Sequence, residues 1–139
     1  MPPNKSNSKF LYSFIREEVE YRQLLGAVKT EFLQKPLPIL VCGLCDGASD
    51  SFIVSLISDV RRHRKETALL LCPEEKECLR ICEILNSVGI RSGFYNSRDY
   101  TFYNITASHE YEHERLKVLS GLISGELDAV ITTPDAALG

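Results

Sequence analysis

Three short stretches of the chain are almost wholly apolar, and each is predicted to form a buried strand. They are PILVC at 38–42, ALLLC at 68–72, and AVI at 129–131, which continues into two threonines. Continuous apolar runs of this length are typical of parallel strands that are covered on both faces, because a strand with one face in water alternates. A further strand is predicted at 91–95.

Between the strands, apolar residues recur every three or four positions, which predicts amphipathic helices. The predicted helices span 14–33, 51–60, 74–88 and 109–123. In the last of them, Leu116, Leu119 and Ile123 are expected to face the core, while Gly89 is expected to end the third in a left-handed cap. The alternation of strands and helices predicts an α/β fold with a parallel sheet flanked by helices.

Composition narrows the class of protein. The chain has 139 residues, of which 44% are hydrophobic, and a net charge of -3. This length suits one domain, and the acidic balance argues against a free-standing nucleic-acid-binding protein. The polar start MPPNKSNSK lacks the apolar core of a signal peptide, and no apolar run could span a bilayer. We therefore expect a disordered lead-in at 1–9, one α/β domain at 10–139 and a cytoplasmic location.

The first apolar run is followed by GLCDGASDSF and then a helical pattern, which is the context of a phosphate-binding loop. A working loop reads G-x-x-x-x-G-K-[ST]: the lysine neutralises phosphate charge and the hydroxyl binds magnesium. Aligning Gly43 with the first glycine puts Ala48 at the second, Ser49 at the lysine and Asp50 at the hydroxyl. Gly43 and Gly47 still permit a tight turn, but Ser49 carries no positive charge and the Asp50 carboxylate would repel a triphosphate.

The loop is therefore interpreted as a degenerate phosphate-binding loop that does not hydrolyse ATP. A simpler interpretation stays open, in which it is a plain strand-to-helix turn capped by Ser49 or Asp50.

Three stretches together resemble the N-terminal segment of the bacterial transcription-repair coupling factors (Mfd). They are GLCDGASDSF, ALLLCPEEKECLRICEIL and ASHEYEHERLKVLSGLISGELDAVITTPDAAL. The family shows a Gly-x-x-x-Gly loop without the lysine, a strand ending near proline before an acidic helix, a serine leading into an Arg-Leu helix, and a strand ending at Thr-Pro before Ala-Leu. The matching positions are Gly43 and Gly47, Pro73, Ser108, Arg115–Leu116, Thr133–Pro134 and Ala137–Leu138.

This resemblance implies a partial RecA- or helicase-like domain, related to the first domain of the excision-repair protein UvrB. The missing lysine favours the coupling factors over UvrB. The resemblance implies a non-catalytic module, without metal or cofactor of its own and without a nucleic-acid contact that can be assigned. The parent protein would displace stalled RNA polymerase, recruit UvrA for nucleotide excision repair, and use ATP and magnesium to move along double-stranded DNA.

Two other functions, nucleotide binding and zinc-dependent hydrolysis, are alternatives to the non-catalytic module. An active phosphate-loop nucleotide-binding domain of the UvrB or helicase type would need a lysine where Ser49 stands. A zinc hydrolase is suggested by HEYEH at 109–113, a match to H-E-x-x-H. A third zinc ligand is expected six residues beyond the second histidine, and that position is Leu119. The match is therefore interpreted as accidental.

The chain has five cysteines, an odd number that together with the missing signal peptide indicates a reducing compartment. Cys42 and Cys45 form a C-x-x-C pair, but Cys42 is expected to point into the core, which disfavours a redox role. Cys78 and Cys82 are expected to pack in the core from one helix face. The basic run RRHRK at 61–65 is interpreted as a solvated helix end.

Overall fold

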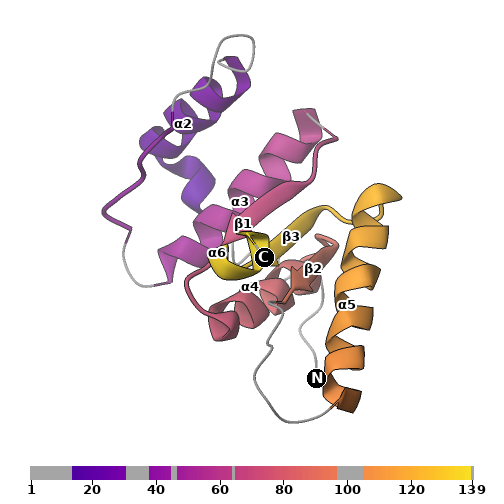
Figure 1. Cartoon of the computed structure of the whole chain (residues 1–139). Coiled ribbons are helices and arrows are strands. Elements are labelled where there is room, and N and C mark those ends of the chain that lie inside the picture. The colour runs from indigo at the N-terminus through magenta and orange to yellow at the C-terminus, as the bar shows by residue number, and fades with distance from the viewer. Residues whose placement is uncertain (1–13, 31–37, 45–46, 64, 97–104, 139) are drawn as a thin grey trace, which may run out of the picture. The chain divides into compact units, whose positions relative to one another are not determined.

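The computed structural model describes residues 14–30, 38–44, 47–63, 65–96 and 105–138. The chain forms two compact units, Met1–Glu66 and Thr67–Gly139, and each is described here by itself. The strands that the structure describes all belong to the second unit (Figure 1). The interpretation of 10–139 as one domain stays a prediction.

The second unit is built on a parallel sheet of three strands. These are β1 (Ala68–Leu71), β2 (Ser92–Tyr95) and β3 (Ala129–Thr132), in the order β1-β3-β2. Helix α4 (Glu75–Ser87) connects β1 to β2, α5 (Ile105–Ile123) connects β2 back to β3, and α6 (Pro134–Leu138) follows β3. The predicted α/β class with a parallel sheet is thus confirmed.

The two connections run in opposite directions across the sheet, so right-handed crossovers place α4 and α5 on opposite faces. Helix α4 contacts β2 and β3 and contributes the buried residues Cys78, Ile81 and Leu85. Helix α5 contacts β2, where a Cβ added to Gly93 would lie 3.3 Å from Val118 Cγ2. The missing side chain at this position therefore allows the helix to approach the strand closely.

The centre of the core is β3, as its apolar run predicts. Every residue of β3 is buried, and the exposed fraction of Ile131 is 0%. The register aligns Val130 with Leu69 on one side and with Gly93 on the other, so β3 is hydrogen-bonded along both edges.

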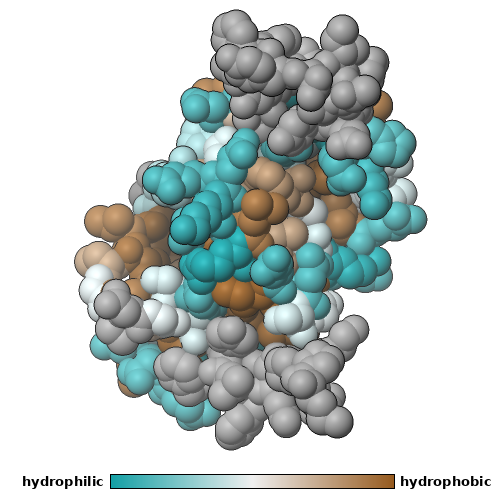
Figure 2. Space-filling view, turned by 90° about the horizontal axis from the view of Figure 1, so that it is seen from below, coloured by the Kyte–Doolittle hydropathy of each residue, from teal (hydrophilic) through white to brown (hydrophobic). Residues whose placement is uncertain are grey.

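Strand β1 differs from its prediction, because it is not buried on both faces. Leu69 and Leu71 are 63% and 57% exposed, whereas Ala68 and Leu70 are half-buried. An apolar run therefore does not distinguish a central strand from an edge strand. Apolar side chains also reach the surface elsewhere, as brown patches among hydrophilic residues (Figure 2).

The C-terminal end of α4 is formed as the sequence predicts. Gly89 has φ 88°, which glycine adopts without strain, and its N–H donates to the carbonyl of Asn86 at 3.1 Å. The Ile90 N–H donates to the carbonyl of Leu85 at 2.9 Å. These bonds satisfy carbonyls at the end of the helix, as the predicted left-handed cap requires.

The prediction for α5 was wrong in its helical phase. Leu116 and Ile123 are exposed, at 64% and 87%, and Leu119 is 39% exposed. The buried positions are instead Arg115 and Val118. Arg115 can lie inward because its guanidinium group packs on an aromatic ring, which a count of apolar residues does not detect.

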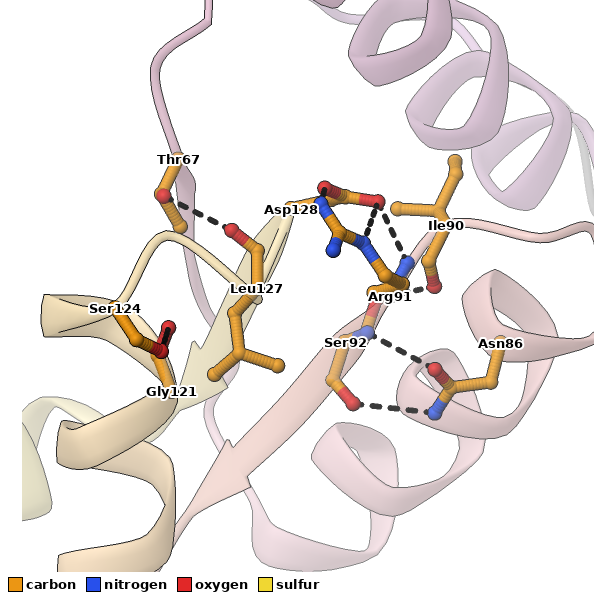
Figure 3. A network of polar contacts seen from close by, with 9 residues as sticks. All are labelled: Thr67, Asn86, Ile90, Arg91, Ser92, Gly121, Ser124, Leu127 and Asp128. Atoms are coloured by element: carbon orange, nitrogen blue, oxygen red, sulfur yellow. Dashed lines mark hydrogen bonds and ion pairs between the residues drawn. The ribbon is translucent and has the colours of Figure 1, made fainter.

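A polar network fixes the end of the sheet where β2 and β3 begin (Figure 3). The Asp128 side chain is 3% exposed and accepts hydrogen bonds from the Arg91 backbone N–H at 2.9 Å and from Arg91 Nη2 at 2.8 Å. Thr67 Oγ1 donates to the Leu127 carbonyl at 3.1 Å. The turn before β3 is thereby tied to the residues that precede β1 and β2.

In the part of the first unit that the structure describes, the regular elements are helices. A 3-10 helix, η1 (Phe14–Glu17), and α2 (Val19–Thr30) lie where one helix was predicted, and α3 (Ala48–His63) is longer than predicted at both ends. These three elements contact one another, and the rings of Tyr21 and Phe52 meet edge to face at 6.2 Å.

The predicted strand at 38–42 is not formed. Residues 38–44 have no regular secondary structure and are exposed, with Leu40 at 89%. A strand needs a neighbour to accept its N–H and carbonyl groups, and the described residues of the first unit offer only helices. The predicted phosphate-binding loop therefore lacks the strand that should precede it.

Within the described ranges, no helix is long and apolar enough to cross a membrane. The aromatic-rich segment 93–107 contains the end of β2, at Tyr95, and the start of α5, at Ile105. Its middle, 97–104, lies outside the described residues.

Candidate functional site

The loop before α3 contains two glycines in the left-handed region of backbone space. Gly43 and Gly47 have φ values of 79° and 84°, a region that residues with a side chain rarely adopt. Helix α3 then begins at Ala48, so Ser49 and Asp50 lie in its first turn. Residues 45 and 46 lie outside the described part of the chain.

The side chains of this loop do not supply the chemistry for a triphosphate. Ser49 is exposed and Asp50 is half-buried, and the Asp50 carboxylate lies at the positive end of the helix dipole. Asp50 also has an interaction partner of its own. A carboxylate in this place stabilises the helix and opposes the approach of a second anion.

The groove beside the loop is apolar. It has a volume of about 830 Å³ and lies among α2, the start of α3 and residues 39–44. Its lining includes Leu24, Ile39, Leu40, Val41, Leu44 and Phe52. Its charged lining residues are Glu18 and Glu20, and none of the described residues that line it is basic. Positive charge strengthens phosphate binding, and the described lining has none, while its two glutamates oppose the approach of an anion.

The HEYEH segment lies on α5, as the metal hypothesis requires, and the structure describes the side chains of its last two residues. Glu112 and His113 are exposed. The side chains of His109, Glu110 and Tyr111 lie outside the described residues. Among the residues that are described, no three His, Cys, Asp or Glu side chains are grouped so that they could hold a metal ion.

The cysteines differ strongly in their surroundings. Cys42 is exposed, which contradicts its expected place in the core and follows from the absence of a strand at 38–42. Its partner in the C-x-x-C pair, Cys45, lies outside the described residues. Cys78 is fully buried as predicted, whereas Cys82 is only half-buried and donates to the Ser92 carbonyl at 3.5 Å.

Cys72 and Cys78 form a buried pair of thiols that the sequence did not single out. Cys72 follows β1, Cys78 lies in the first turns of α4, and their thiols are hydrogen-bonded to each other. Burial raises the pKa of Cys72, and it raises the pKa of Cys78 to about 12. Protonated thiols are poor nucleophiles and poor metal ligands, so this pair serves packing.

Two buried polar networks were also not predicted from the sequence. In the first unit, Asp59 accepts hydrogen bonds from Tyr21 Oη at 2.5 Å and from Arg16 Nε at 3.1 Å. Burial raises the pKa of Tyr21 above its ordinary value, and the neighbouring Asp59 raises it further. The phenol therefore stays protonated and acts as a donor.

In the second unit, Arg115 is 6% exposed and lies with its guanidinium carbon 4.6 Å from the centre of the Tyr95 ring. Its Nη2 donates to Tyr95 Oη, and its Nη1 has no hydrogen-bond partner among the described residues. Asn96, which follows Tyr95, is 7% exposed, and its Oδ1 likewise has no partner in the described ranges. Sequence reasoning used Arg115 only as part of a family motif and did not consider Asn96.

The basic run at 61–65 occupies the end of α3, where cations are favoured by the helix dipole. Arg62 and His63 are exposed, in agreement with a solvated helix end, and residue 64 lies outside the described part.

Comparison of the chain with protein-family models, with curated proteins and with solved structures found no match.

Proposed function

We propose that the chain is a non-catalytic α/β module similar to the N-terminal UvrB-like part of a transcription-repair coupling factor. In this proposal its parent is an ATP-dependent DNA translocase that displaces stalled RNA polymerase and recruits UvrA. The observation that carries the non-catalytic part is the loop before α3, which has two left-handed glycines but Ser49 and Asp50 in place of a lysine and a hydroxyl.

The surroundings of the loop support the same proposal. A nucleotide would meet the Asp50 carboxylate and the apolar groove with its two glutamates, and no described basic residue lines that groove. The runner-up is an active nucleotide-binding domain of the UvrB or helicase type. It is disfavoured because a triphosphate would have to bind through backbone N–H groups alone, against a carboxylate.

Isothermal titration with ATP and magnesium tests the proposal. The native chain is expected to show no binding at micromolar ATP, whereas Ser49→Lys combined with Asp50→Thr removes the repulsion and should bind ATP weakly without hydrolysing it. The matched control is Ser120→Lys combined with Asp135→Thr, which makes the same change in net charge at two exposed positions outside the loop. Micromolar binding by the native chain would contradict the non-catalytic proposal and favour a nucleotide-binding one.

The family assignment has a separate test. The parent gene should encode, after Gly139, a long continuation that contains an intact lysine-bearing phosphate loop. A gene that encodes no such motor would overturn the assignment and leave the loop chemistry unaffected.

A further inference from the structure

A groove in the second unit runs along the outer edge of β2, between α4 and α5. Its volume is about 610 Å³. The floor is apolar, formed by Leu79, Phe94, Val118 and Leu127. Because the residues of β2 line it together with residues from helices on both faces of the sheet, the groove follows the side of β2 that is not paired with β3.

The backbone of β2 alternates between β3 and the groove. The Arg91 carbonyl accepts from the Ala129 N–H, so Gly93 and Tyr95, two and four positions on, also face β3. Ser92 and Phe94 then direct their N–H and carbonyl groups to the outer edge. The edge of a sheet presented in this way is a template for another strand.

At Ser92 a side chain already takes the place of such a strand. Asn86 Oδ1 accepts from the Ser92 N–H at 2.9 Å, and Asn86 Nδ2 donates to the Ser92 carbonyl at 3.2 Å (Figure 3). An amide that donates and accepts at one residue reproduces the two bonds of a neighbouring strand. It occupies the edge groups of Ser92 and leaves those of Phe94, which lines the groove, for another strand.

At the other end of the groove lies an acceptor that no described residue satisfies. Asn96 lines the groove and is 7% exposed, and its Oδ1 has no hydrogen-bond partner in the part of the chain that the structure describes. Leaving a buried polar atom unsatisfied has a cost in free energy. A donor placed in the groove, such as a backbone N–H, would remove this cost.

The charge of the groove indicates which occupant fits. Among the described residues that line it there are three glutamates, Glu75, Glu114 and Glu126, and one basic residue, Lys117. A second copy of this chain, whose net charge is -3, is electrostatically the poorer occupant.

We propose that the groove binds an extended basic segment of a partner protein, which adds as a strand along the outer edge of β2. Its backbone pairs with Phe94 and donates to Asn96 Oδ1. Because the side chains of a strand alternate between its two faces, its apolar side chains cover Leu79 on the α4 face and its cationic side chains meet Glu114 and Glu126 beside α5. This inference concerns a different unit from the loop before α3 and does not depend on the proposed function.

Fluorescence anisotropy on the full chain tests the proposal, with a short labelled peptide of alternating lysine and valine as the probe. A glutamate–valine peptide tests charge, and a lysine–valine peptide with methylated backbone nitrogens tests strand pairing. The lysine–valine peptide is expected to bind, and both comparison peptides are expected to bind at least about tenfold more weakly.

Two double variants with the same change in net charge separate the groove from the rest of the surface. Glu114→Lys with Glu126→Lys reverses two groove residues, whereas Glu83→Lys with Glu112→Lys reverses two exposed residues that do not line it. The first pair should weaken binding about tenfold and the second less than about twofold. Circular dichroism confirms that each variant is folded.

Three results would overturn the proposal. The first is no binding of the lysine–valine peptide, or equal binding of the methylated one. The second is an equal loss of affinity in both double variants. The third is a dimer in sedimentation that Glu114→Lys with Glu126→Lys dissociates, since this would assign the groove to a second copy of the chain.

Discussion

Residues 38–42 and 129–132 have nearly the same apolar character and opposite structures. The second stretch is β3, where Ile131 is fully buried at the centre of the sheet. The first has no regular secondary structure, and Leu40 is 89% exposed. An apolar run thus indicates that a stretch is suited to a strand. Whether the strand forms depends on the pairing partners that the rest of the fold provides.

The difference lies in the neighbours that each stretch finds. β3 is paired along both edges, with β1 and with β2, so its backbone groups are satisfied and its side chains are covered. The described residues around 38–42 in its own unit are helical. Strand pairing is a non-local interaction, and its partners cannot be identified from the five residues of a run.

The largest effect that this comparison predicts is on folding stability. Ile131→Ala should lower the free energy of unfolding by about 2–5 kcal/mol, because it leaves a cavity under α4. The matched variant in the other stretch, Leu40→Ala, should change it by less than about 0.5 kcal/mol. Urea unfolding followed by circular dichroism measures both, and a similar loss in the two variants would mean that 38–42 is packed as tightly as β3.

A smaller effect is expected where β3 begins. Asp128→Ala removes a buried acceptor from the Arg91 backbone N–H and from the Arg91 guanidinium, and should cost about 2 kcal/mol. The control is Asp135→Ala, an exposed carboxylate in the first turn of α6, with an expected change within about 0.5 kcal/mol. The same urea titrations apply, and equal small changes would show that the network at the sheet entrance contributes little to stability.

Local signals predicted well what is decided locally. Helices α3 and α4 follow from apolar periodicity, and the end of α4 follows from Gly89, whose left-handed conformation needs only its own sequence neighbours. The phase of α5 could not be obtained in this way, because Arg115 is buried against Tyr95, a residue twenty positions away on β2. Patterns that count apolar residues place an arginine outside.

The two candidate sites also differ in how far they could be predicted from local sequence. The left-handed glycines of the loop before α3 could be located from spacing alone, since Gly43 and Gly47 have positive φ and Ser49 and Asp50 follow them in the first turn of the helix. Its interpretation as an altered phosphate loop stays a prediction. The groove beside β2 could not, because it exists only once the edge of β2, the walls of α4 and α5 and the turn at Leu127 are brought together. No short motif marks such a surface.

The smallest effects on stability are expected at the cysteines, which compare the exposed stretch 38–42 with the buried core around the sheet. Iodoacetamide at neutral pH should label the exposed Cys42 at least about tenfold faster than the buried Cys72 and Cys78, since the thiolate is the reactive form and burial disfavours it. Mass spectrometry of the labelled peptides gives the rates. Labelling at Cys42 alone should leave the melting temperature unchanged. Rapid labelling of Cys78 in the folded chain would contradict the buried position of this face of α4.

The pH dependence of melting provides a second measure of the same burial. The pKa of Cys78 is raised from the ordinary 9.0 to about 12, so the folded state holds its proton over a range in which the unfolded state loses it. The stabilisation from this thiol is therefore complete below pH 9.0 and declines as the pH rises toward about 12. The melting temperature should fall over this window, and it should fall less in Cys78→Ala, which has no thiol to ionise. Cys42→Ala should follow the native chain, because its exposed side chain has no burial to lose on unfolding. If Cys78→Ala and the native chain show the same decline, ionisation elsewhere controls melting in alkali, and the buried thiol pair contributes nothing to it.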